Sequence, residues 1–140
     1  MPTPRQCEDL ARILGGTGES ENGICKVTVP RTDIDFTIMD IPSKAMLHHM
    51  FTFEPIPNVT QRTLNLGEMV LLQEEVPFVV RQLSQQGILI SGIHNHWLFD
   101  EPHLIYIHME ARMRPREFAQ SVADTLAAMI THRYFEEDTP

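Results

Sequence analysis

Three histidines between Gly87 and Arg112 are spaced in a way that could bind a metal ion. Successive side chains of a β-strand point to opposite faces of a sheet, so His94 and His96 should project from the same face. A neighbouring strand that contributes His108 would bring three imidazoles together, the arrangement of a site that activates a bound water. The sequence therefore predicts a divalent metal site at His94, His96 and His108.

The ligand types indicate which metal and which further groups such a site would use. Nitrogen and oxygen ligands without a thiol favour zinc, although copper, nickel or iron fits the same set. The fourth position would be taken by Glu101, by His48 or by a solvent molecule, and Glu101 would otherwise act as the acid or base beside the activated water. Tyr106 and His48 are candidates for contacting a bound cofactor. We therefore hypothesise that the protein binds a metal ion. A further hypothesis is that it is a metalloenzyme that acts on a small molecule.

The pairing register of the two strands decides whether these side chains meet. The segment is typical of two strands joined by a turn at Phe99–Pro102. If the numbers of opposed residues sum to an even value, as when His94 faces His108 or Tyr106, the three histidines and Tyr106 share one face. A one-residue slip would mix polar and apolar side chains on both faces, so we expect the even register.

Three other interpretations use the same residues. The histidines could form hydrogen bonds with Tyr106 or Glu110 on a half-exposed sheet face and have no further role. A binding module could hold a small organic molecule against Tyr106, Trp97 and Phe99 without any reaction. The open face could also be a homodimer interface. Three measurements separate these interpretations: the metal content of the protein, the detection of a bound organic molecule, and the molecular mass in solution.

The rest of the chain predicts the elements that position this hairpin. A first helix should begin with a capping box of Thr3 and Gln6 and end at Gly15, with a flexible turn at Thr17-Gly18. On the strand that follows Ser43, His49 falls on the apolar face and His48 on the polar one. Strands are expected at 24–29 and 34–39, which would pair as an antiparallel ribbon, and at 45–54 and 63–72.

Two later helices are expected, one at about 73–86 and one that begins at Pro115. Glu74 and Glu75 suit the positive N-terminal end of the first of these helices. The C-terminal half then has the order β-α-β-β-α, which predicts an α+β fold: a two-layer, mixed or antiparallel sheet with helices packed on one face. At 140 residues the chain should form a single domain, residues 1–140.

Composition limits the partners and the compartment. The formal charge of -8 argues against nucleic acid or an anionic membrane as the main partner. No stretch has the length of a membrane-spanning helix, and the N-terminus lacks the pattern of a signal peptide. We therefore expect a cytoplasmic protein in which Cys7 and Cys25 are reduced, with one bridge between them as the alternative. Its expected partner is a small-molecule ligand or substrate, with a homodimer as an alternative assembly.

Part of this pattern resembles a known family. The runs ICKVTVPRTDIDFTI and GEMVLLQEEVPFVVRQLSQQGILISGIHNHWLFDEPHLIYIHMEA, with the helix that follows them, are similar to the LppY/LpqO-type bacterial family, a domain of unknown function. The resemblance covers about residues 15–130. Its most specific piece is the pattern of His94-Asn95-His96, Glu101-Pro102 and His108. The resemblance implies that the hairpin matters, and it supplies no mechanism.

Overall fold

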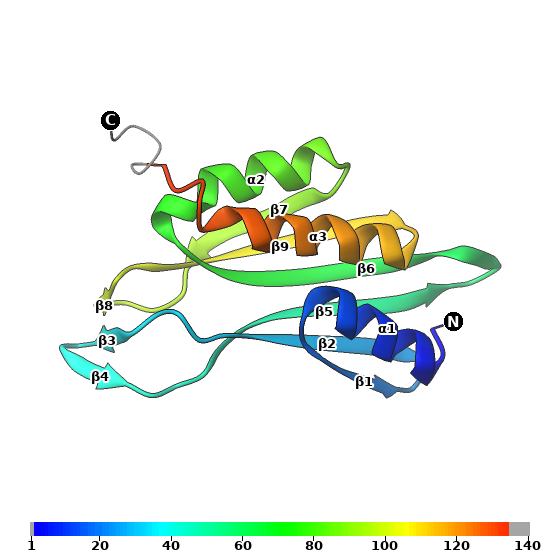
Figure 1. Cartoon of the computed structure of the whole chain (residues 1–140), viewed down its shortest axis with the longest axis horizontal. Helices are drawn as coiled ribbons and strands as arrows, with labels where there is room; N and C mark the ends of the chain where they lie inside the picture. The colour runs from blue at the N-terminus through cyan, green and yellow to red at the C-terminus, as the bar shows by residue number, and fades with distance from the viewer. Residues whose placement is uncertain (1, 135–140) are drawn as a thin grey trace.

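The computed structural model describes residues 2–134, which form two β-sheets and three α-helices (Figure 1). The larger sheet has six strands, in the spatial order β1 (Thr17–Glu21), β2 (Ile24–Arg31), β5 (Leu47–Ile56), β6 (Val59–Leu72), β9 (Leu104–Met113) and β7 (Leu89–Asn95). The smaller sheet consists of β4 (Ile41–Ser43), β3 (Phe36–Ile38) and β8 (Asp100–Glu101). Every neighbouring pair is antiparallel, which confirms the α+β prediction and the β-α-β-β-α order of the C-terminal half.

The first and last of the three helices begin where the local sequence predicts them to begin, and the middle one begins three residues after the predicted Gln73. Helix α1 (Pro4–Leu14) has the capping box of Thr3 and Gln6, and Gly15 ends it in the left-handed conformation with φ 77°. Helix α2 (Val76–Gln85) follows a 3-10 turn, η1 (Gln73–Glu75). Helix α3 (Pro115–Met129) starts with its proline in the first turn, where no intrahelical partner for a backbone N–H is needed.

The main core lies between these helices and one face of the large sheet. Inward residues of the central strands, such as Phe51, Phe53, Leu71 and Ile107, are fully buried there together with Phe118 of α3. The two phenylalanines of β5 meet Phe118 edge to face, with ring centroids 6.3 and 5.8 Å apart. The helices therefore cover the odd-numbered face of β9, as the sequence predicted, and leave its histidine on the other side.

One end of that other face is covered by the small sheet. A second cluster of buried residues forms there, with Phe36 of β3 against Val70 and Leu104 of the large sheet. Trp97 and Tyr106 pack against this cluster, and the Phe36 and Trp97 rings are stacked with centroids 5.6 Å apart. Two of the three aromatic residues proposed for a binding module, Trp97 and Tyr106, therefore already pack inside the protein.

Two predictions about the N-terminal half are wrong. The expected turn at Thr17-Gly18 is the start of strand β1, which pairs along β2. The expected ribbon of 24–29 with 34–39 does not form, because β1 and β5 already occupy both hydrogen-bonding edges of β2. Only Phe36–Ile38 of the second segment is a strand, and it pairs with β4 and β8 instead.

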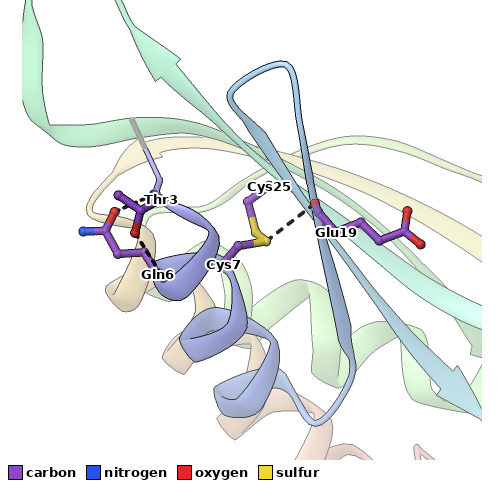
Figure 2. The surroundings of a disulfide bond; sticks show 5 residues. All are labelled: Thr3, Gln6, Cys7, Glu19 and Cys25. Atoms are coloured by element: carbon purple, nitrogen blue, oxygen red, sulfur yellow. Dashed lines mark hydrogen bonds between the residues drawn. A yellow bond between two sulfur atoms is a disulfide. The ribbon is translucent and has the colours of Figure 1, made fainter.

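The expectation of reduced cysteines is also wrong. Cys7 on the buried side of α1 and Cys25 on the inward face of β2 form a disulfide, with their Cα atoms 5.4 Å apart (Figure 2). Spacing along the sequence could not reveal this bond, because only the packing of α1 on β2 brings the two residues within bridging distance. None of the helices in residues 2–134 is long and apolar enough to cross a membrane.

Candidate metal centre

The predicted register of the histidine hairpin is confirmed. His94 lies opposite Tyr106 and Ile93 opposite Ile107, so the residue numbers sum to an even value. A bulge between Ile90 and Gly92 shifts the register by one residue at the start of β7. From Gly92 onward, His94 of β7 therefore shares with Tyr106 and His108 of β9 the face that the helices leave uncovered.

His94 and His108 form the closest pair on this face. Their Nε2 atoms are 2.9 Å apart, and the two rings lie nearly parallel, with centroids 5.0 Å apart and an angle of 24° between the planes. His108 is opposite Gly92, where an added Cβ would be in ordinary van der Waals contact with the imidazole, 3.5 Å from its Cδ2. The side chain of His108 remains 38% exposed, so a ligand from solvent can reach the pair.

The second nitrogen of each ring has its own partner. His94 Nδ1 lies 2.9 Å from the carbonyl oxygen of Asn95, which can only accept a hydrogen bond. The proton is then on Nδ1, and the neutral ring presents a lone pair at Nε2. His108 Nδ1 lies 3.9 Å from the carboxylate of Glu68, which is beyond hydrogen-bond distance and does not fix the tautomer of His108. At 2.9 Å, His108 Nε2 can donate a hydrogen bond to His94 Nε2 when it carries the proton, and it presents a second lone pair when Nδ1 carries it.

His96, the third predicted ligand, lies in an aromatic stack. It follows the last residue of β7, and its ring is 3.4 Å from the centroid of Trp97 and 3.8 Å from that of Tyr106. Trp97 turns to the same side as His96, whereas a regular strand would have placed the two on opposite faces. Burial lowers the pKa of His96 to about 4, so its imidazole is neutral at physiological pH. Its Nδ1 is buried and has no hydrogen bond in the described structure.

The remaining candidates lie around this row of rings. Tyr106 is between His94 and His96, with its centroid 5.7 Å from that of His94, and burial followed by the charge of Glu68 raises its pKa. His48 is on β5, two strands away from β9 in the sheet. Glu101 is on β8 opposite Thr37, and within residues 2–134 no hydrogen bond or ion pair joins it to the three histidines. Over the same residues, no group of three or more His, Cys, Asp or Glu side chains is arranged to hold a metal.

One known family matches most of the chain. Residues 8–128 match the sequence model of the family described as Domain of Unknown Function (DUF1259). The chain belongs to this DUF1259 family. No curated protein and no solved structure matches the chain. The match contains all the strands of the large sheet and the histidine pair, so the pair is part of the DUF1259 domain.

A second polar cluster in this DUF1259 domain was missed from the sequence. Glu75 is fully buried and accepts two hydrogen bonds from Arg31, at 2.6 and 2.7 Å, and a third from the backbone N–H of Leu72. Arg31 also donates to Asp33 and to the carbonyl of Val70. From the sequence, Glu75 was expected to interact with the positive N-terminal end of a helix. The one feature that could have indicated its burial is its place directly before the apolar face of that helix.

His49 lies next to this cluster, and the prediction that it faces the core is confirmed. It is only 2% exposed, and its Nδ1 accepts a hydrogen bond from the backbone N–H of Val70 at 3.2 Å. Burial, helped by the positive charge of Arg31, lowers the pKa of His49 to about 3. This histidine therefore stays neutral. It accepts the hydrogen bond from Val70 that a backbone carbonyl of a neighbouring strand would otherwise accept.

Proposed function

We propose that this domain binds a divalent transition-metal ion through Nε2 of His94 and Nε2 of His108. The observation that carries the proposal is the distance of 2.9 Å between two exposed ring nitrogens, of which His94 Nε2 presents a lone pair in the neutral ring. With its proton on Nδ1, His108 presents a lone pair at Nε2 as well, and a cation between the two nitrogens would then form two favourable bonds. A hydrogen bond from His108 Nε2 to His94 Nε2 is the alternative that the experiment must separate.

The distance is close to what a metal needs. Two nitrogens at about 2.1 Å from one zinc ion, with a tetrahedral angle between them, are about 3.4 Å apart. The rings of His94 and His108 are exposed enough to open by the remaining half ångström or so. Glu68 lies 3.9 Å from Nδ1 of His108, and by closing to hydrogen-bond distance its carboxylate would orient a metal-binding histidine and raise its basicity.

His96 determines whether the site has two or three histidine ligands. The three-histidine site predicted from the sequence needs its ring to leave the stack with Trp97 and Tyr106, or its Nδ1 to be the donor that faces the ion. The orphaned Nδ1 supports the second arrangement, because a buried ring nitrogen without a partner is costly. Zinc is the first choice of metal, with copper, nickel or iron as the others that nitrogen ligands suit.

Catalysis stays a further prediction. An ion held by two or three histidines keeps positions for water, and such a water is acidic enough to act as a nucleophile near neutral pH. The role of Glu101 as acid or base would require it to approach that water from the small sheet. Metal binding does not depend on this step.

The test is a metal titration of protein without an affinity tag. Zinc binding to the wild-type chain is compared by calorimetry with binding to His94→Ala, His108→Ala and the control His48→Ala, a histidine on another strand. We expect each of the first two changes to abolish measurable binding, and the control to retain it. Glu68→Gln should weaken binding by about tenfold, as loss of an orienting carboxylate does. His96→Ala separates a two-histidine from a three-histidine site. Equal affinity in wild type, His94→Ala and His108→Ala would refute the proposal.

The disulfide indicates the kind of compartment in which the protein would bind the metal. Disulfides persist in oxidising compartments and are rare in the cytosol. We propose an oxidising compartment in place of the cytoplasm that the sequence suggested, and thiol titration of protein isolated from its native source tests it. The closer resemblance to LppY/LpqO-type proteins likewise stays a prediction.

A further inference from the structure

A hollow of about 660 Å³ lies on the other side of the histidine hairpin. Its apolar wall consists of Val76 and Pro77 at the start of α2, Ile93 of β7 and Ile105 of β9. Ile93 pairs with Ile107, a residue of the helix-covered core, and alternates with His94 along the strand. The sheet therefore separates this hollow from the proposed metal site, and the two can be tested independently.

A histidine held by a buried carboxylate forms part of the hollow's rim. His103 Nδ1 is 3.0 Å from Asp100 Oδ1, and His103 lines the hollow. Asp100 is 4% exposed, and its second oxygen accepts a hydrogen bond of 2.9 Å from the backbone N–H of Leu104. Burial alone would raise the pKa of Asp100, but the hydrogen bonds from Leu104 and His103 lower it below its ordinary value. Asp100 is thus a fixed carboxylate.

This carboxylate determines what the imidazole can offer. An ionised carboxylate only accepts hydrogen bonds, so in the neutral form of His103 the proton is on Nδ1 and the lone pair is on Nε2. Within residues 2–134 no hydrogen bond engages that Nε2, and the side chain is 64% exposed. The arrangement fixes an acceptor of known orientation beside an apolar wall, which is the usual make-up of a small-molecule site.

We propose that this hollow binds a small organic molecule with an apolar body and an O–H or N–H group. That group would donate a hydrogen bond to Nε2 of His103. The apolar body would contact Ile93 and Ile105. Glu74 carries the formal negative charge of the wall, so neutral and cationic molecules are preferred over anions. The volume lies within the range of about 300–1,000 Å³ that is typical of ligand sites.

The test uses three aromatic probes of one size that differ in charge: benzyl alcohol, benzylamine and benzoate. Binding is followed by NMR of isotope-labelled isoleucine methyl groups in the full chain. Benzyl alcohol and benzylamine should shift the methyl signals of Ile93 and Ile105 in a saturable way, while benzoate should not. His103→Ala should weaken the binding of benzyl alcohol by about fivefold, the effect of one lost hydrogen bond.

Two exposed positions on one strand give a matched pair of variants. Ile93 is 53% exposed and lines the hollow, whereas Leu89 is 66% exposed and does not. Neither is a core residue, so Ile93→Ser and Leu89→Ser should both fold. Ile93→Ser should reduce the affinity for benzyl alcohol, and Leu89→Ser should leave it unchanged. The proposal is overturned if the probes cause no saturable shift, if benzoate binds as well as benzylamine, or if His103→Ala binds as tightly as wild type.

Discussion

The two polar clusters of this molecule differ in how completely their hydrogen-bonding groups are used. Around Arg31, Glu75 and His49, the buried guanidinium and carboxylate bind each other, and the imidazole accepts a hydrogen bond from the backbone of Val70. Between His94 and His108, two ring nitrogens lie 2.9 Å apart at the surface, where a ligand can reach them. The first cluster is closed to solvent, whereas the second is open to a ligand, which we propose to be a metal ion.

This difference separates a structural role from a binding role more sharply than residue type does. Both clusters contain a histidine near a charged group, although strand alternation already predicted His49 on the apolar face and His94 on the polar one. A histidine satisfied by a backbone amide stabilises the fold, whereas a pair of imidazoles at the surface can hold a ligand. Substitutions in the first cluster should therefore change stability, and substitutions in the second should change binding.

The largest stability effect is expected at Glu75. Glu75→Gln removes the charge that compensates the buried guanidinium of Arg31, and loss of one partner from a buried ion pair costs about 3–5 kcal/mol. Urea unfolding measures the change. Glu74→Gln, at the neighbouring and partly exposed position, is the control and should change the unfolding free energy by less than about 0.5 kcal/mol. Equal effects at the two positions would mean that the buried pair is not what stabilises this region.

The disulfide should have the next largest effect. Replacing Cys7 and Cys25 by alanine releases a loop with a sequence separation of 18, for which the expected loss of stability is about 3 kcal/mol. Thermal unfolding with and without a reductant provides the comparison. Reductant should lower the melting temperature of the wild type and leave the double variant unchanged. A wild type insensitive to full reduction would contradict the expectation.

Acid should weaken the buried cluster through His49. Its pKa is about 3 in the folded state and about 6.5 when unfolded, so below about pH 6.5 the unfolded chain binds a proton that the native chain does not. This contribution to stability is present above pH 6.5 and is lost as the pH falls, by about 2 kcal/mol between about pH 6.5 and pH 5. His49→Asn retains an acceptor for the amide of Val70 without titrating in this range. Its stability should depend less on pH, and an identical slope would show that His49 is not the group that titrates.

The smallest stability effect is expected at the surface pair. His94→Ala and His108→Ala should each change the free energy of unfolding by less than about 0.5 kcal/mol in metal-free buffer, because neither ring is part of a core cluster. Added zinc should stabilise the wild type and neither variant, since a ligand that binds only the native state raises its stability. A large loss of stability in metal-free buffer would assign the pair a structural role.

Local patterns predicted the parts of the fold that local chemistry determines. The capping box at Thr3 and the even register that places His94 beside Tyr106 both follow from side-chain spacing. What the sequence missed depends on contacts between distant segments. Glu75 meets Arg31, and Cys7 meets Cys25, only after helices have packed on the sheet.

The candidate site divides in the same way. Alternation along the strands was enough to place the histidines on one face, because the pleat fixes the direction of each side chain. It was not enough to predict where each ring would turn. His96 is just beyond the end of β7, where the regular alternation stops, and packing against Trp97 and Tyr106 sets its orientation.

The most direct test of the metal site is a crystal structure of the chain grown with zinc chloride, with diffraction data collected on both sides of the zinc absorption edge. We predict an anomalous peak between His94 and His108, about 2.0–2.1 Å from both Nε2 atoms. Crystals that show no such peak, with the two Nε2 atoms still in direct contact, would contradict the proposal and leave the pair as a proton-sharing hydrogen bond.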